Sequence, residues 1–261
     1  MSRITIITVT KNNLEGLIAT HESLKQIDFP FDWVIKDSES TDGTAEYVQN
    51  FCKSSRFMEM HDKGIFDGMN IALKEVKTEY VIFLNAGDRL CSANELQSSL
   101  DLLIDTGKNW LVAGTLISSS WTPVGYWETP TFPYLWRYLG LQSWCHQSTI
   151  YKSDFLLRNG AFDENNVIAD WSTALILEQL ELPIIRVQPL TIFELGGTSG
   201  SLSRGKWLDL HTKGRDTANL LFRKSLILDK LFISYPTYLM IQRPFLRRLF
   251  LPIFKRFLKT G

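Results

Sequence analysis

Short apolar segments and amphipathic segments alternate along the first hundred residues. Four segments are apolar or rich in β-branched residues, and each predicts a strand: 4–9, 32–36, 57–60 and 80–84. Four others have helical periodicity: 14–26, 44–51, 67–76 and 96–104. Strand–helix units of about 30 residues favour βαβ crossovers and a parallel sheet covered on both faces. We therefore expect a Rossmann-like α/β fold.

Residues 110–151 break this alternation. They are rich in Trp, Thr, Ser and Pro, and the strands that they predict are irregular. Five tryptophans fall within them: Trp110, Trp121, Trp127, Trp136 and Trp144. Such a cluster favours aromatic packing in an antiparallel extension, and a platform for a sugar or a lipid is the alternative. A helix over 170–182, a strand over 184–189 and a glycine-rich loop at 196–200 are expected to follow.

The composition, 44% hydrophobic and 21% charged, excludes a chain that is disordered throughout. The 28 basic and 28 acidic residues cancel, but they are unevenly placed. Residues 201–261 contain 13 Lys and Arg against 3 Asp and Glu, which leaves 15 against 25 in residues 1–200. We expect an acidic domain over 1–200, divided into 1–105 and 106–200, and a basic helical extension over 201–261.

The cysteines and the lengths of the apolar runs indicate the cellular compartment in which we expect the protein. Cys52, Cys91 and Cys145 form no C-x-x-C pair, so we expect no disulfide framework, no structural zinc, and a reducing, cytoplasmic setting. Residues 4–9 predict a strand rather than a signal peptide. The sequence has no uncharged apolar run of about 18 residues, so we expect no helix that spans a membrane.

Polar residues follow three of the predicted strands, at the edge where an open parallel sheet binds ligands. Thr10 follows the first strand, Asp37 the second and Asp88 the fourth. A carboxylate that ends a buried strand, such as Asp37, must find hydrogen-bond donors or face a ligand. Asp88 suits a hard divalent cation, with a helix cap as the alternative, and Asp42 is either a loop residue of the site or a cap. The sequence lacks both G-x-G-x-x-G and the P-loop, so neither of these phosphate sites is expected.

Several segments occur in a specific order and at specific intervals. They are VTKN, VIKDSESTDGT, DKGIFDGMNIAL and YVIFLNAGD, then CHQSTIY, IADWSTAL and IFELGGTSG. Together they resemble the family-2 inverting glycosyltransferases over residues 3–200, and among these the bacterial transferases of exopolysaccharide, O-antigen and colanic-acid-type assembly. The resemblance implies the A-type glycosyltransferase fold, with a mostly parallel Rossmann-like sheet and an irregular acceptor-side region.

The resemblance implies a nucleotide-sugar site at the carboxyl edge of the sheet. Thr8, Thr10 and Asp37 match residues that hold the nucleotide, with Asp37 at the base. Ser40 and Asp42 match residues that shape the following loop. Later motifs supply further donor-site candidates: Asp67, Asn70 and Asn85. For Asp67 the alternative is a helix-start residue that complements the helix dipole.

The metal motif that the resemblance implies has fewer acidic residues in this chain than is usual for the family. The family commonly has two acidic residues separated by one, whereas this chain has Asn85-Ala86-Gly87-Asp88. Mn²⁺ or Mg²⁺ is therefore expected at Asp88. One carboxylate with the donor diphosphate and waters makes a looser site than two carboxylates do.

Two residues match the acceptor side of the family. Asp170, in the segment IADW, matches the catalytic base at the start of a helix, where a carboxylate takes the proton of the attacking acceptor hydroxyl. Its local sequence fits a helix cap equally well. His146, followed by Gln147, matches an HQ pair and is expected to contact the diphosphate or the acceptor. A packed core histidine is the alternative for His146.

The C-terminal segment favours contact with a membrane. Over 244–259, large apolar residues share one helical face and basic residues lie beside it, which is typical of helices on anionic membranes. This fits the lipid-linked acceptor that the resemblance implies, and a peripheral position on the inner face of the cell membrane. Packing on the body or on a second copy is the alternative, and the oligomeric state stays open. The acidic body argues against nucleic acid as a partner.

The leading hypothesis is an inverting transferase that moves a sugar from a nucleotide-sugar donor to a lipid-linked glycan in bacterial surface polysaccharide synthesis. A nucleotidyltransferase would usually need a glycine-rich phosphate loop near the first strand, which this sequence lacks. A catalytically inactive, membrane-docked nucleotide-binding or scaffold subunit is the other alternative, and the thin metal motif favours it. The sequence names neither the sugar, the nucleotide, the acceptor nor the linkage.

Overall fold

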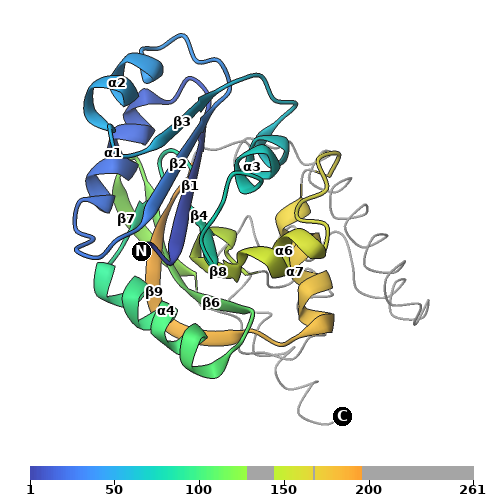
Figure 1. Cartoon of the computed structure of the whole chain (residues 1–261). Helices are drawn as coiled ribbons and strands as arrows, with labels where there is room; N and C mark the ends of the chain where they lie inside the picture. The colour runs from blue at the N-terminus through green and yellow to red at the C-terminus, as the bar shows by residue number, and fades with distance from the viewer. Residues whose placement is uncertain (128–143, 167, 196–261) are drawn as a thin grey trace, which may run out of the picture. The chain divides into compact units, whose positions relative to one another are not determined.

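Residues 1–127, 144–166 and 168–195 are described by a computed structural model of the chain (Figure 1). Several sequence-based predictions fall outside the described residues: Trp136, the loop at 196–200, the basic extension at 201–261 and its amphipathic segment at 244–259. Within the described ranges, no helix is both long and apolar enough to cross a membrane.

The N-terminal half folds into four parallel strands in the spatial order β3-β2-β1-β4. The strands are β1 (Ile4–Thr10), β2 (Asp32–Asp37), β3 (Arg56–Glu59) and β4 (Tyr80–Phe83). The connecting helices are α1 (Leu14–Leu24), α2 (Thr44–Phe51) and α3 (Ile65–Leu73). The predicted βαβ units are confirmed. As a result, the carboxyl ends of β1, β2 and β4 lie at one edge of the sheet.

Beyond β4 the sheet becomes mixed, and it continues in the order β8-β6-β9-β5. These strands are β8 (Thr149–Lys152), β6 (Trp110–Ser119), β9 (Ile184–Leu195) and β5 (Arg89–Leu90), and β7 (Thr122–Trp127) pairs with β6. The remaining helices are α4 (Ala93–Thr106), η1 (His146–Ser148), α6 (Ser153–Arg158) and α7 (Ala169–Leu180). β8 runs antiparallel to both β4 and β6, whereas β6 and β9 run parallel.

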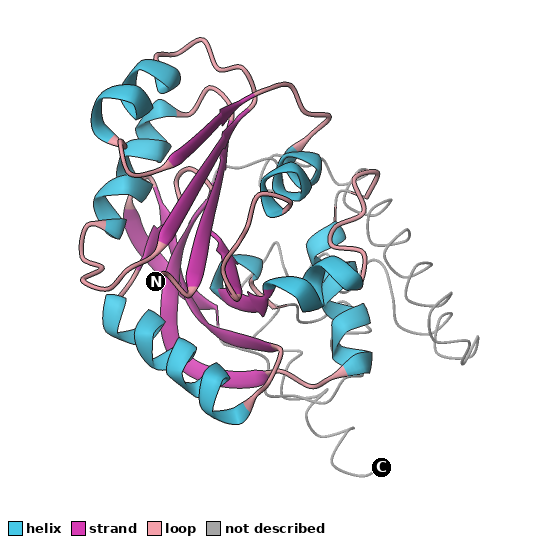
Figure 2. Cartoon of the chain, viewed as in Figure 1, coloured by secondary structure: helices cyan, strands magenta, loops and turns pink. Residues whose placement is uncertain are grey.

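Helices cover both faces of the sheet (Figure 1 and Figure 2). Strand β1 alternates between the two faces, with Ile4 and Ile6 in one hydrophobic core and Ile7 and Val9 in the other. The first core receives apolar side chains of α1, α2 and α4. The second receives those of α3, α6 and α7. Burial on both faces fits the apolar run Tyr80–Phe83 of β4, whereas β1 also buries three threonines, Thr5, Thr8 and Thr10.

Helix boundaries follow local capping chemistry. Helix α3 begins at Ile65 rather than at the expected position 67, because Gly64 at its N-cap adopts a φ of 149°, in a region that favours glycine. Helix α4 begins at Ala93, where the Ser92 hydroxyl accepts the Glu95 N–H, and it ends at Gly107 in the left-handed region.

The strands expected to be irregular over residues 110–151 are only slightly so in the described part of that range. Strand β6 is ten residues long, and its register shifts near Gly114 against β9 and near Ile117 against β7. The predicted antiparallel extension is present as the β6–β7 hairpin and the β6–β8 pair. Trp110 and Trp144 are buried and stack with ring centroids 4.9 Å apart, so aromatic packing accounts for these two. Trp121 is 37% exposed.

Candidate active site

Asp37 lies at the end of β2 with no exposed surface. Its carboxylate accepts hydrogen bonds from the Ser40 backbone N–H (2.8 Å) and from the Ser40 hydroxyl (2.5 Å). A buried carboxylate needs such donors, and here the following loop supplies them. Ser40 thus holds Asp37 in place, and it shapes the loop as the resemblance implies.

The loops after β1, β2 and β4 are joined by polar side chains that the sequence analysis did not single out. The Asn12 side chain accepts the Thr41 N–H at 2.8 Å, and the Asn12 N–H donates to Ser40 Oγ at 2.7 Å. The Asn13 amide donates to the Ala86 carbonyl at 2.9 Å. Asn12 has a φ of 47°, a conformation that asparagine adopts more readily than most residues. These bonds hold the three loops of the carboxyl edge together.

Asp42 joins the starts of two helices. Its carboxylate accepts the Leu14 N–H of α1 at 2.8 Å, and the Thr44 N–H and hydroxyl of α2 at 3.2 and 2.6 Å. Partial burial acts to raise the pKa of Asp42, but these hydrogen bonds outweigh it and hold the pKa below its ordinary value. Of its two interpretations, the structure supports the capping one, and it extends the cap to α1.

The two predicted threonines of β1 differ in their surroundings. Thr8 is fully buried, and its hydroxyl accepts the Trp33 indole N–H at 3.0 Å, which is a contact of the core. The Thr10 hydroxyl is buried, and it has no hydrogen-bond partner in the described part of the chain. Thr10 is therefore the threonine that keeps hydrogen-bonding capacity at the carboxyl edge.

Asp67 and Asn70 of α3 bond to backbone groups. Asp67 Oδ2 accepts the Lys63 N–H at 2.8 Å, just before the helix, as its helix-start alternative requires. The Asn70 amide donates to the Phe162 carbonyl at 2.7 Å and accepts the Phe162 N–H at 3.2 Å. Asn70 therefore ties α3 to the segment before α7. Contact of either residue with a donor stays a prediction.

Asp88 lies in the turn after β4 and is 4% exposed. Its carboxylate accepts the Glu194 backbone N–H of β9 at 3.1 Å, and the Gln147 side-chain amide also donates to it. Burial raises the pKa of Asp88 to about 7, and the nearby charge of Glu194 adds to this shift. The helix-cap alternative for Asp88 is wrong, because Ser92 caps α4.

The oxygen atoms around Asp88 fit a divalent cation with few protein ligands. Asn85 Oδ1, in the same turn, is buried without a hydrogen-bond partner among the described residues, whereas Glu194 Oε2 is ion-paired with the Arg89 guanidinium at 3.7 Å. Carboxylate and amide oxygens are the ligands that Mg²⁺ and Mn²⁺ prefer. The described ranges contain no cluster of three or more His, Cys, Asp or Glu that could hold a metal. A cation at Asp88 would therefore need ligands from the substrate, which fits the thin motif.

His146 is buried among aromatic rings of Phe83, Phe162 and Tyr151. Its Nδ1 lies 3.3 Å from the Tyr151 hydroxyl, and its Nε2 has no hydrogen-bond partner among the described residues. Burial lowers the pKa of His146 to about 3, so the imidazole is neutral at physiological pH. This placement favours the packed-histidine alternative, and contact with the diphosphate or acceptor stays a prediction.

Asp170 is the second residue of α7 and is half-buried. The N-cap is Ile168, so Asp170 is not the N-cap residue itself. Burial raises the pKa of Asp170, and N–H groups of the first helical turn partly oppose this shift. Asp170 is also close enough to Tyr151 for its charge to help raise the tyrosine pKa. Tyr151 thus contacts His146 and is also affected by the charge of Asp170.

A series of interactions runs from Asp88 toward Asp170. Asp88 bonds to Gln147, Gln147 follows His146 in the chain, His146 contacts Tyr151, and the charge of Asp170 acts on Tyr151. The Cys145 thiol donates to the Gln147 amide oxygen at 3.2 Å, which leaves the amide nitrogen to face Asp88. The predicted metal residue and the predicted base are thus linked through η1 and β8.

Residues 5–165, more than half of the chain, match the model of the family described as "Glycosyl transferase family 2". The chain belongs to this family. Membership places it among the glycosyltransferases, as the sequence motifs predict. Asp37, Asp67, Asn70 and Asp88 all lie inside the matched residues, and Asp170 lies five residues beyond them.

Two solved structures have the same fold as this family-2 chain. One is S. aureus TarS 1-349 in complex with UDP-GlcNAc, with a TM-score of 0.65, 18% identity, and coverage of 84% of this chain and 67% of that chain. The other is the mannosyltransferase PcManGT from Pyrobaculum calidifontis, in complex with GDP-Man and Mn²⁺, with a TM-score of 0.60, 17% identity, and coverage of 94% and 68%. The predicted A-type glycosyltransferase fold is confirmed.

One sequence relative is a teichoic acid poly(glycerol phosphate) polymerase of Staphylococcus epidermidis. It is 35% identical over 98 residues, which are 35% of this chain and 14% of the polymerase. The family-2 chain therefore spans only a small part of this relative's length.

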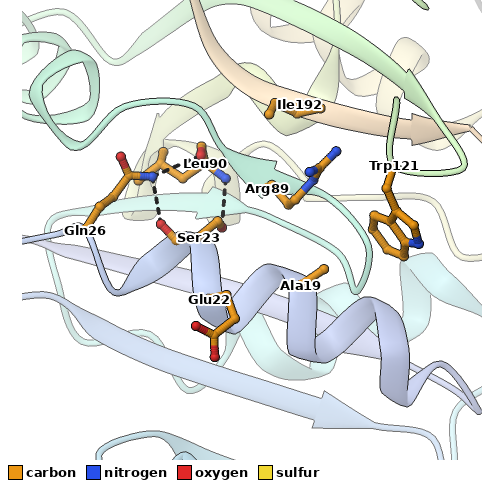
Figure 3. Close-up of a pocket in the computed structure, with 8 residues that line it drawn as sticks. All are labelled: Ala19, Glu22, Ser23, Gln26, Arg89, Leu90, Trp121 and Ile192. Atoms are coloured by element: carbon orange, nitrogen blue, oxygen red, sulfur yellow. Dashed lines mark hydrogen bonds between the residues drawn. The ribbon is translucent and has the colours of Figure 1, made fainter. Parts of the chain in front are cut away.

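An open depression of about 450 Å³ lies on the α1 side of β5 (Figure 3). It is lined by Ala19, Glu22, Ser23, Gln26, Arg89, Leu90, Trp121 and Ile192. The Arg89 guanidinium lies over the Trp121 ring at 5.4 Å. None of the site residues predicted for this family-2 chain lines the depression, although Arg89 directly follows Asp88. The candidate active site is therefore the carboxyl edge of the sheet rather than this depression.

Proposed function

We propose that this protein is an inverting glycosyltransferase that moves a sugar from a nucleotide-sugar donor to a glycan acceptor. Membership of family 2 supports the class of reaction. The observation that carries the proposal is the series of interactions that runs from Asp88 through Gln147, His146 and Tyr151 toward Asp170. A carboxylate for the metal and a carboxylate for the acceptor proton are thereby held in one framework.

The nucleotide would bind at the carboxyl ends of β1 and β2. Asp37 would meet the base, Thr10 offers a free hydroxyl, and Ser40 fixes the loop. TarS is described in complex with UDP-GlcNAc and the mannosyltransferase in complex with GDP-Man, so both a uridine and a guanosine donor occur on this fold. The sugar and the base of the donor for this chain are open to experiment.

Asp88 would hold Mn²⁺ or Mg²⁺, with Asn85 as a further oxygen donor. When bound, such a cation neutralises the charge that develops on the leaving diphosphate. The ionised form of Asp88 is the one that binds a cation, and its pKa of about 7 places that form above neutral pH. The mannosyltransferase of the same fold is described with Mn²⁺.

Asp170 would act as the general base in a single displacement. It would take the proton of the acceptor hydroxyl as that oxygen attacks the anomeric carbon from the face opposite the diphosphate. A carboxylate whose pKa is raised by burial is a stronger base than an exposed one. The Tyr151 hydroxyl beside it would help to orient the carboxylate.

The acceptor would be a lipid-linked saccharide, and the process would be the assembly of a bacterial surface polysaccharide. The teichoic acid polymerase relative supports a polymer of the cell surface. The basic, amphipathic sequence at 244–259 supports peripheral contact with the inner face of the cell membrane. The second candidate is an inactive nucleotide-binding or scaffold subunit, which the single acidic residue of the metal motif favours.

The test is a calorimetric titration of UDP, GDP and CMP and their common sugar conjugates, each with and without Mn²⁺. We expect micromolar binding of one nucleotide that requires Mn²⁺ and is lost in Asp88→Asn. Asp170→Asn should retain nucleotide binding but lower turnover at least about 1,000-fold, because its amide cannot accept the proton. Turnover is measured as hydrolysis of the sugar conjugate, in which water accepts the sugar in place of the glycan and the nucleoside diphosphate is released. The matched control is Asp101→Asn, at an exposed carboxylate on α4.

Two results would contradict the transferase. Nucleotide binding by the wild type without any turnover, in the presence of Mn²⁺ and lipid vesicles, would favour the scaffold subunit. Binding of none of the nucleotides would overturn the donor site itself.

A further inference from the structure

A lysine is buried at the carboxyl end of β2. Lys36 is 0% exposed, and it directly precedes Asp37. Lysine is almost never fully buried, because removing an ammonium from water is costly unless it is paired and hydrogen-bonded. An apolar residue would fill this position of a buried strand without the free-energy cost of removing a charge from water. The presence of the lysine therefore calls for a specific role.

The Lys36 ammonium has three acceptors, one for each of its protons. They are the carbonyl of Asp37 at 3.2 Å, the carbonyl of Met60 at 2.7 Å and the carboxylate of Asp62 at 2.5 Å. One acceptor belongs to β2, and two belong to the segment that follows β3. The side chain therefore ties the end of β2 to residues 60–62.

Asp62 carries the contact on to the start of α3. Its other carboxylate oxygen accepts the Gly64 N–H at 3.1 Å, and Gly64 is the N-cap of α3. Residues 60–64 have no helix or strand of their own, so these bonds are what fixes their path beside Asp37. The Met60 N–H also donates to the Asp37 carbonyl at 3.0 Å.

We infer that Lys36 is a positioning residue for the nucleotide-base end of the donor site. It holds residues 60–64 against Asp37 before the donor arrives, so that this wall of the site is already formed. A preformed wall spares the ordering of a loop when the ligand binds. The inference rests on the proposed function, which places the base at Asp37, and it adds a residue that does not itself touch the nucleotide.

The test compares two probes for the two ends of the donor. Calorimetry in the presence of Mn²⁺ measures the preferred nucleoside diphosphate, which uses the base end, and inorganic pyrophosphate, which does not. The variant is Lys36→Met/Asp62→Asn, which removes the ion pair without leaving a buried charge unpaired. We expect its affinity for the nucleotide to fall at least tenfold, and its affinity for pyrophosphate to change less than twofold.

Two further variants support the comparison. Arg186→Met/Glu95→Gln removes a 2.7 Å ion pair between β9 and α4, away from β2, and should leave both affinities unchanged. If the double variant of Lys36 does not fold, Asp62→Glu replaces it, because glutamate keeps the charge and both carboxylate oxygens but displaces them by one methylene group relative to Lys36 and Gly64. We expect the same direction of change from this milder variant.

The outcomes separate this inference from the proposed function. If the wild type binds a nucleotide and the variant binds it equally well, only the inference is overturned. An equal loss of nucleotide and pyrophosphate affinity would mean a general structural role, and it would overturn the inference as well. If the wild type binds no nucleotide, the proposed donor site fails, and the role of Lys36 in it fails too.

Discussion

At the scale of single residues, the ionised form of Asp88 destabilises the metal-free fold, but it is also the form that would bind the cation. It is buried beside Glu194, and its pKa rises from 3.8 to about 7. The protonated form therefore stabilises the fold relative to the ionised form. This stabilisation is fully present below pH 3.8 and is lost as the pH rises through about 7. A bound cation would remove the penalty.

We predict that Asp88→Asn makes the metal-free protein more stable than the wild type, by a margin that grows from pH 5 to pH 8. The margin should increase by about 2–3 kcal/mol, because the wild-type carboxyl ionises in this window and the amide does not. The Asn oxygen can still accept the Glu194 N–H. Urea denaturation in a chelating buffer at pH 5, 6.5 and 8 measures the free energy of unfolding. The exposed Asp154, changed to Asn, is the control. A margin that is constant or shrinks with pH would contradict the prediction.

Single residues also show what sequence can and cannot reveal. Asp37 was identifiable because an acidic residue that ends a buried strand is unusual, and Asp88 because it follows an apolar strand and two small residues, Ala86 and Gly87. Lys36 and Glu194 gave no such signal. A lysine or glutamate near a strand end is normally solvated. Only the positions of Asp62 and Asp88 in the structure show that Lys36 is buried and that Glu194 is constrained. Their partners lie 26 and 106 residues away in the chain.

At the scale of elements, Asp42 couples α1 to α2. Its carboxylate accepts N–H groups at the start of each helix, groups that would otherwise have no partner within the helix. Because Asp42 lies in the loop that begins with Asp37, the same bonds stabilise the expected nucleotide loop. Hydrogen bonds hold its pKa below the ordinary value, although partial burial opposes them.

We predict that Asp42→Ala lowers the free energy of unfolding by about 1–2 kcal/mol, the range for loss of a helix cap. The loss should be full at neutral pH and should shrink as the pH falls below 3.8, because the wild-type carboxylate is protonated below its ordinary range. Denaturation at pH 7 and at pH 3 measures it. Glu46→Ala, at an exposed carboxylate in the first turn of α2, is the control. A loss that persists unchanged at pH 3 would mean that packing, and not the carboxylate, is responsible.

The elements of the N-terminal half were predictable because each repeats a local pattern. Continuous apolar runs gave β1 and β4, and the Asp-Gly turn before Thr44 marked the start of α2. The end of β9 was not predictable. It continues six residues past Pro189, because it pairs with β6 on one side and with β5 on the other. A proline normally indicates the end of a strand, but here pairing with β6 and β5, which are distant in the sequence, extends the strand past it.

At the scale of the whole described unit, the two faces of the sheet and its carboxyl edge have different roles. The α1, α2 and α4 face and the α3, α6 and α7 face bury the core, and the edge collects the polar residues. The order β4-β8-β6-β9-β5 could not be derived from the sequence, because antiparallel and parallel pairs mix within it. This order matters for the site, since it brings Glu194 of β9 and Gln147 of η1 to Asp88.

The basic extension adds a feature that belongs to the whole chain. Residues 201–261 carry a net charge opposite to that of residues 1–200. Five basic residues lie beside the apolar face predicted for 244–259: Arg247, Arg248, Lys255, Arg256 and Lys259. Each basic residue near an anionic membrane contributes about 1 kcal/mol of attraction, which salt screens. An acidic body that acts on a lipid-linked acceptor would need such an attraction to stay at the membrane.

We predict that the full-length protein sediments with phosphatidylglycerol-containing vesicles and not with phosphatidylcholine vesicles, and that salt weakens the binding. Changing the five basic residues to Gln should lower the partition coefficient at least about 100-fold, since each removed charge weakens the attraction. The control changes three exposed basic residues of the body, Arg3, Arg56 and Arg158, to Gln, and should bind as the wild type does. Equal binding by the five-residue variant, or concentration-dependent dimerisation that it abolishes, would instead assign the extension to packing on a second copy. Nucleotide affinity should be unchanged in both variants, because the residues expected to hold the donor and its cation all lie between positions 8 and 88 and none of them is changed.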